Sequence, residues 1–140
     1  MSSPLDVIRA LDQLEAEADV LAVRIHVWHL VVWTKSPVRP LAARLAGVYP
    51  IALRLIEGYR EARALQIGAA QTAGHHQVLP SQLAILTDSE TALSSRIERV
   101  RFLITSKEGE EHAKRSVMLG VGGFILGALS LVPVLRGLFR

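Results

Sequence analysis

Five histidines are the side chains with the clearest potential for metal or haem chemistry. His26 and His29 are three residues apart, which places two imidazoles on one helix face, where they could share a metal ion. No carboxylate stands at a matching offset, and neither an HExxH nor an ExxH pattern occurs. His75 and His76 fall in a predicted loop. The pattern favours polar residues at an interfacial helix end, and we predict neither a metal nor a cofactor.

Catalytic patterns are also missing from the sequence. There is no GxSxG nucleophile motif, no phosphate-binding glycine loop and no cysteine nucleophile. Glu108 and His112 are four residues apart, but beside Lys114 and Arg115 they indicate a charged face next to a membrane. We therefore predict that the protein is not an enzyme.

The glycines near the end of the sequence give the most specific signal. Gly123 and Gly127 form a small-xxx-small pair inside an apolar segment, and Gly120 and Ser116 extend the stripe in steps of three and four. In lipid, close backbone approach across small residues brings helices together, because apolar side chains gain nothing by leaving apolar surroundings. The stripe predicts helix packing or self-association. The alternative is that small residues only ease insertion or bending.

These glycines belong to Ser116–Leu135, twenty residues without a charge. Lys114 and Arg115 precede the stretch, and Arg136 follows it. A helix of this length covers about 30 Å, the thickness of the hydrocarbon core of a bilayer. We predict a C-terminal membrane anchor, with Lys114, Arg115 and Arg136 at its interfaces. The alternative is a helix or helical hairpin buried in a soluble core.

Composition supports a small membrane-associated helical protein. The chain has 140 residues, is half hydrophobic, and has a mean hydropathy of +0.31 and a net charge of +3. Residues 1–34 carry two basic and five acidic side chains, and residues 35–66 carry six and two, so these segments should attract each other. No dense basic run or basic patch with aromatic residues occurs, which argues against nucleic acid as a partner. The first residues lack the features of a cleaved signal peptide.

The first predicted helix spans about residues 4–34. Ser3 and Pro4 form a favourable helix start. Apolar residues then recur in steps of four and three, the pattern of a helix that packs lengthwise on another: Val7, Leu11, Leu14, Ala18, Leu21, Ile25, Trp28 and Val32. A strand is the local alternative for Val20–Trp33, and Trp28 and Trp33 could reach lipid headgroups.

The second predicted helix spans about residues 40–67. Its seam is Leu41, Leu45, Val48, Ala52, Leu55, Tyr59 and Ala62. Pro50 predicts a kink or break near Tyr49. Arginines on its flanks are expected to meet acidic residues of the first helix: Arg44, Arg54, Arg60 and Arg63. Residues 68–80 form the predicted loop.

The third predicted helix spans about residues 80–106. Its seam includes Leu83, Leu86, Glu90, Leu93, Ile97, Val100 and Ile104. Thr87-x-x-Glu90 has the spacing of a capping box, so the helix could begin at Thr87 instead. Thr105-x-x-Glu108 is a second capping box, which predicts a new helix there with a hinge at Gly109. We accordingly divide the chain into a bundle over 1–106 and a membrane-proximal and anchoring segment over 107–140.

The predicted fold is all-α, with three long antiparallel heptad-patterned helices followed by a hydrophobic transmembrane helix. We expect a non-enzymatic, membrane-anchored protein that self-associates or recognises a helical partner, with the N-terminal bundle cytoplasmic and a single pass through the lipid bilayer. A pore-forming effector is the sharper form of this hypothesis. The alternatives are a subunit of a larger membrane complex and a soluble oligomer that buries its apolar tail between protomers.

Overall fold

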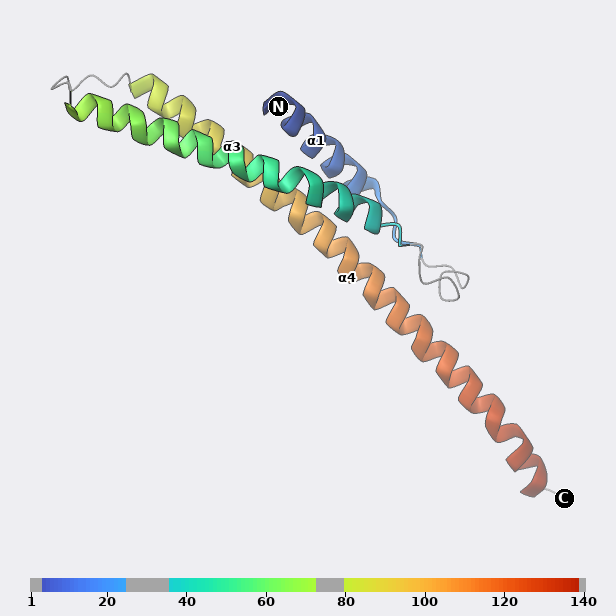
Figure 1. The fold of residues 1–140 in the computed structure, drawn as a ribbon. Coiled ribbons are helices and arrows are strands. Elements are labelled where there is room, and N and C mark those ends of the chain that lie inside the picture. Colours follow the sequence, from blue (N-terminus) through green and yellow to red (C-terminus); the bar gives the residue numbers. More distant parts are fainter. Residues whose placement is uncertain (1–3, 25–35, 73–79, 139–140) are drawn as a thin grey trace.

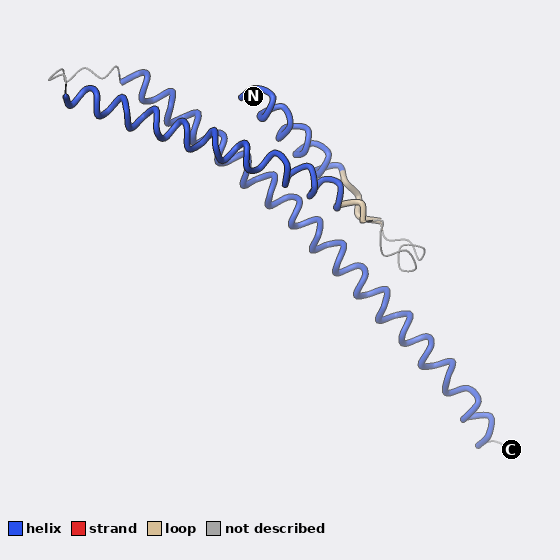
Figure 2. The backbone as a smooth tube through the Cα atoms, in the orientation of Figure 1, coloured by secondary structure: helices blue, strands red, loops and turns tan. Residues whose placement is uncertain are grey.

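The computed structural model describes residues 4–24, 36–72 and 80–138, which form three helices and no strand. These helices are α1 (Pro4–Val20), α3 (Arg39–Thr72) and α4 (Pro80–Leu138). Each of the three contacts the other two, and the lower part of α4 extends well beyond its neighbours (Figures 1 and 2). The prediction of an all-α chain with one long apolar helix is confirmed for the described residues.

The core lies where α1 crosses the other two helices. Because the apolar residues of α1 recur in steps of three and four, one face of α1 is apolar and is buried against α3 and α4. The buried apolar side chains are Val7, Leu11, Leu14, Ala18, Val23, Val38, Leu41, Leu45, Ala52, Ile56, Leu93, Ile97, Val100 and Ile104. We call α1 and the parts of α3 and α4 that hold these side chains the packed region.

Helix α1 is shorter than the sequence predicts. It ends at Val20, and residues 21–24 continue without helical structure. The backbone N–H of Leu21 donates to the Ala18 carbonyl at 3.4 Å, and that of Arg24 donates to the Ala22 carbonyl at 2.9 Å. This change of direction buries Val23, which a continued helix would have placed off the seam. The rest of the predicted helix, to about Thr34, lies outside the described residues.

Helix α3 begins after a serine cap and continues further than predicted. The Ser36 hydroxyl accepts a hydrogen bond from the Arg39 backbone N–H at 3.2 Å, and Pro37 follows the cap. The helix is not broken at Pro50, which is exposed, so water can reach the Ala46 carbonyl that lacks a donor. Residues 68–72, predicted as loop, are helical, and the Thr72 hydroxyl donates to the Gly68 carbonyl at 2.9 Å.

Helix α4 is continuous over 59 residues, so the predicted break at residues 105–108 and the hinge at Gly109 are wrong. Neither capping box begins a helix. The Thr87 hydroxyl donates to the Leu83 carbonyl at 2.8 Å within the helix, while Glu90 binds arginines of α3. The helix continues because its buried face extends from Leu93 past Ile104 to Glu111, and a break would interrupt this packing.

Ion pairs flank the core. Arg44 of α3 binds Glu17 of α1 at 2.6 Å, as expected. Arg60 and Arg63 do not reach α1; they bind Glu90 of α4 at 2.6 and 3.1 Å. The reason is that α1 lies beside only the first part of α3, whereas α4 continues alongside its later part (Figure 1). Two further bridges join α1 to α4, between Arg96 and Asp12 and between Arg99 and Glu15.

Candidate membrane-spanning segment and its polar junction

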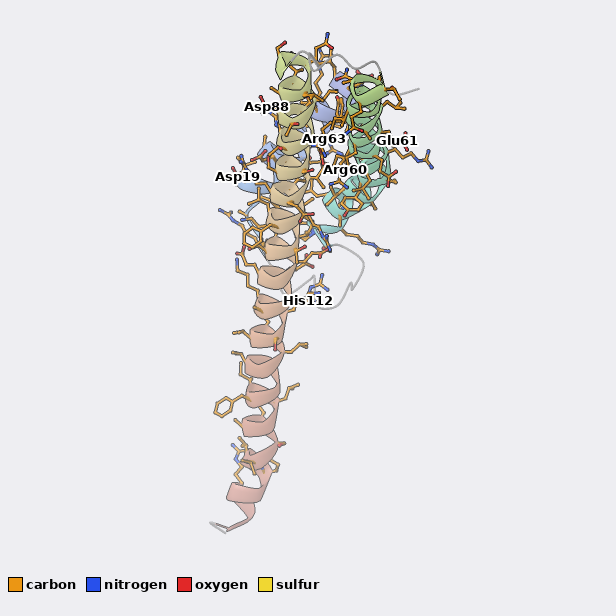
Figure 3. All side chains as sticks on the ribbon, turned by 90° about the vertical axis from the view of Figure 1, so that its left-hand side faces the viewer. Asp19, Arg60, Glu61, Arg63, Asp88 and His112 are labelled. Carbon is orange, nitrogen blue, oxygen red and sulfur yellow. The ribbon has the colours of Figure 1, made fainter. Side chains whose placement is uncertain are left out.

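The lower part of α4 carries almost only apolar side chains, and no other described helix covers it (Figure 3). From Ser116 to Pro133 no side chain is buried. By length and composition, α4 is the one helix of the described chain that is apolar enough to cross a membrane. Its large exposed residues here are Val117, Leu119, Val121, Phe124, Ile125, Leu126, Leu129, Leu131 and Val132.

The small residues singled out by the sequence lie on this exposed part of α4. Ser116, Gly120, Gly123 and Gly127 are all exposed. A Cβ atom built on any of the three glycines would meet no other atom within 4 Å. The space beside these glycines is therefore open in the single chain.

A small polar cluster joins the packed region to this segment. The Glu111 side chain is only 6% exposed, and its carboxylate pairs with the Arg115 guanidinium one turn later. The Ser36 hydroxyl donates a hydrogen bond to the same carboxylate. Since Ser36 also caps α3, this cluster fixes the start of α3 against α4. We call Ser36, Glu111 and Arg115 the polar junction.

Lys114 makes a second link at the same level. Its ammonium group donates to the Val23 carbonyl at 2.6 Å and also pairs with Glu110. The hydrogen bond from Lys114 holds the pKa of the Glu110 carboxyl below its usual value, and Lys107 adds to this effect. The residues after α1 and before α3 are thus both bound to α4 just above Ser116.

The sequence did not single out Ser36 or Glu111. A signal for Ser36 was present, because Ser36–Pro37 repeats the Ser3–Pro4 pattern of a hydroxyl cap followed by proline. A signal for Glu111 was also present, because it lies seven residues beyond Ile104, one heptad further along the same seam. A carboxylate in a seam position requires a partner, which Arg115 and Ser36 supply.

Most predicted seam residues lie in or beside the core. Those that are buried are Val7, Leu11, Leu14, Ala18, Leu41, Leu45, Ala52, Leu93, Ile97, Val100 and Ile104. Leu21, Val48 and Leu55 are half-buried against the core. Ile25, Trp28 and Trp33 lie outside the described residues. At the predicted interfaces, Lys114 and Arg136 are exposed, whereas most of the Arg115 side chain is covered.

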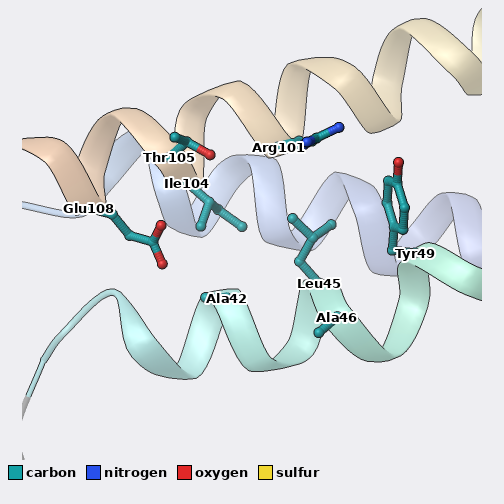
Figure 4. A pocket seen from close by; sticks show the side chains of 8 residues that line it. All are labelled: Ala42, Leu45, Ala46, Tyr49, Arg101, Ile104, Thr105 and Glu108. Atoms are coloured by element: carbon teal, nitrogen blue, oxygen red, sulfur yellow. The ribbon is translucent and has the colours of Figure 1, made fainter.

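A shallow groove runs between α3 and α4, with α1 behind it (Figure 4). Leu45 and Ile104 are the buried residues among its lining side chains, and Tyr49, Arg101 and Glu108 stand at its sides. The full lining is Ala42, Leu45, Ala46, Tyr49, Arg101, Ile104, Thr105 and Glu108. The groove contains no histidine, and among the described residues no hydrogen bond joins the Thr105 or Tyr49 hydroxyl to the Glu108 carboxylate.

The histidines give no metal centre in the part of the chain that the structure describes. His26, His29, His75 and His76 lie outside the described residues, and His112 is exposed on α4 (Figure 3). Within the described ranges, no group of three or more histidine, aspartate or glutamate side chains could hold a metal ion.

Comparisons with models of known protein families, with curated proteins and with solved structures found no match to this chain.

Proposed function

We propose that the protein is a non-enzymatic, single-pass membrane protein, whose antiparallel helical bundle lies on the cytoplasmic side and whose lower α4 segment crosses the bilayer. The observation that carries the proposal is the exposure of the uncharged segment that begins at Ser116. Residues 116–135 continue as one helix, which reaches about 30 Å and matches the hydrocarbon core. Lys114 and Arg136 stand at its two ends, where lipid headgroups would meet them.

Exposure of this segment to water would be unfavourable. Each large apolar side chain contributes about 1.5–3 kcal/mol when it is removed from water, and nine such side chains are exposed here. A continuous apolar surface of this extent in a single chain marks a membrane or protein interaction. Lipid tails would cover this apolar surface without a protein partner. The helix can enter lipid because its backbone N–H and C=O groups are already hydrogen-bonded to each other.

We further propose that two copies of α4 pack against each other. Small residues recur in steps of three and four along one face, and every one of them is exposed: Ser106, Gly109, Ala113, Ser116, Gly120, Gly123, Gly127 and Ser130. This face lies opposite the one that carries Ile104 and Glu111. Ser106 and Ala113 each follow one of these buried residues by two positions, and two positions turn a helix by about 200°. Open space at the glycines allows the backbone of a second helix to approach closely.

Membrane insertion is tested by placing two arginines in the segment. Phe124→Arg with Leu126→Arg adds about 5–7 kcal/mol to the cost of spanning the membrane, from about 2.5–3.5 kcal/mol for each arginine near the centre. The matched control is Ile85→Arg with Phe102→Arg, at two positions of similar exposure in the part of α4 that precedes the apolar segment. We expect carbonate extraction to release the first variant and to leave the control in the membrane pellet. Wild-type protein that stays in solution without detergent would favour the soluble oligomer instead.

Self-association is tested by filling the glycine face. Gly123→Leu with Gly127→Leu should weaken energy transfer between donor- and acceptor-labelled copies in vesicles. Gly122→Leu is the matched control, because Gly122 is offset by about 100° around the helix from Gly123. Equal energy transfer in the wild-type protein, the double variant and the Gly122→Leu control would contradict pairing through this face. It would favour a different helical partner instead.

The pore-forming form of the proposal makes a separate prediction. Dye-loaded vesicles should leak when the full-length protein inserts, and Gly123→Leu with Gly127→Leu should suppress the leak. Vesicles that stay tight at high protein occupancy would rule out pore formation while leaving the anchoring role intact.

A further inference from the structure

Positive charge gathers where the packed region meets the apolar segment. Five basic side chains lie here: Arg24, Arg39, Lys107, Lys114 and Arg115. Three acidic ones lie among them on α4, namely Glu108, Glu110 and Glu111, so the net charge is +2 (five minus three). We call the five basic residues the basic collar. By contrast, α1 carries one basic and five acidic residues.

Two members of the basic collar have no acidic partner within the described ranges. Glu110 is bound to Lys107 and Lys114, and Glu111 is bound to Arg115. Arg24 and Arg39 are exposed, and among the described residues they form no ion pair. Their charges are therefore available to an anion outside the protein.

Two side-chain hydrogen bonds tie the segments that carry these arginines to α4 close to Ser116. Arg24 follows Val23, whose carbonyl accepts from Lys114, and Lys114 lies two residues or about 3 Å above Ser116. The Arg39 backbone N–H donates a hydrogen bond to the Ser36 hydroxyl, and Ser36 in turn binds Glu111. Glu111 lies five residues, or about 7.5 Å, above Ser116 along α4. The headgroup layer on each side of the bilayer is roughly 5–7 Å thick. Lys114 therefore lies within that layer and Glu111 at its outer edge, and the segments they bind carry Arg24 and Arg39 close to the headgroups.

We propose that the basic collar binds the headgroups of anionic phospholipids through Arg24 and Arg39; this rests on the proposed membrane-spanning role of α4. A guanidinium group matches the geometry of a phosphate and donates two parallel hydrogen bonds to it. Anionic lipids also attract basic residues near the membrane surface, and salt weakens this attraction. The collar therefore selects anionic lipids around the anchor and favours a leaflet that contains them for the packed region.

The test measures which lipids contact the full-length protein in vesicles. Spin-labelled phosphatidylglycerol and spin-labelled phosphatidylcholine report the motionally restricted lipid at the protein surface. We expect the association constant for phosphatidylglycerol to exceed that for phosphatidylcholine by at least about twofold at low salt, because one basic residue near an anionic surface changes association by up to about fivefold. The ratio should fall towards one in 0.5 M NaCl and in Arg24→Gln with Arg39→Gln.

The matched control is Arg9→Gln with Arg54→Gln, two exposed arginines far from Ser116 along α1 and α3. This control loses the same charge and should keep the wild-type ratio. An equal fall in both double variants, or a ratio of one in the wild-type protein, would overturn the collar. Failure of the membrane-spanning role looks different, because no motionally restricted lipid would then appear with either label.

Discussion

Replacing Glu111 with alanine is expected to destabilise the packed region far more than the same change at Glu98, although both carboxylates pair with an arginine on α4. Glu111 is 6% exposed and Arg115 is 19% exposed, so the alanine variant leaves a largely buried guanidinium without its counter-ion. Removing one partner of a buried pair costs about 3–5 kcal/mol. The variant also removes the acceptor of the Ser36 hydroxyl.

The Glu98–Arg101 pair is the internal control. Its side chains are 67% and 59% exposed, and the charged atoms are 4.0 Å apart. Exposed pairs of this kind contribute under about 1 kcal/mol, so Glu98→Ala should change the unfolding free energy little.

Denaturant unfolding of the full-length protein in detergent, followed by helical circular dichroism, measures both losses. Glu111→Leu with Arg115→Met removes both charges and should recover most of the stability, because replacing a buried pair by apolar side chains is often neutral. Equal losses of unfolding free energy in Glu111→Ala and Glu98→Ala, or a double variant less stable than Glu111→Ala, would show that the Glu111–Arg115 pair does not hold the packed region together.

Two further predictions concern the core and the distal ion pairs. Leu14→Ala should lower the unfolding free energy by about 2–5 kcal/mol, whereas Leu65→Ala, at an exposed position, should change it little; denaturant unfolding compares them. The Arg60 hydrogen bond, with the Arg63 charge, lowers the pKa of Glu90, so this carboxylate stabilises the fold above about pH 4.3 and loses that contribution as the pH falls through its lowered pKa. Thermal unfolding between pH 7 and 3 should show a shallower acid loss in Glu90→Gln, and an identical pH profile would contradict the assignment.

Local sequence patterns predicted the elements whose signals are local. The spacing of Val7, Leu11 and Leu14 placed one face of α1 in the core because helical periodicity follows from the chain itself. The same reasoning identified the uncharged segment that begins at Ser116, since its length and composition are continuous in sequence.

Helix ends and contacts across the fold were harder to predict. The Thr105-x-x-Glu108 spacing is that of a helix start, yet Ile104 and Glu111 are buried on either side of it and keep α4 continuous. Just beyond the end of α1, the Val23 carbonyl accepts a hydrogen bond from Lys114, which is 91 residues away in the sequence. A pattern of neighbouring residues does not predict contacts between residues far apart in the sequence. The pairing of Arg60 with Glu90 is a second example.

Cysteine labelling tests whether the segment that begins at Ser116 crosses a membrane. The protein contains no cysteine, so Phe102→Cys and Leu126→Cys each introduce a single thiol. The two positions are 72% and 70% exposed in the structure and would react equally in water. In carbonate-washed membranes, we predict that a water-soluble maleimide labels the thiol at position 102 and leaves the one at 126 unlabelled. Equal labelling at both positions, or the absence of protein from the washed membranes, would contradict the account.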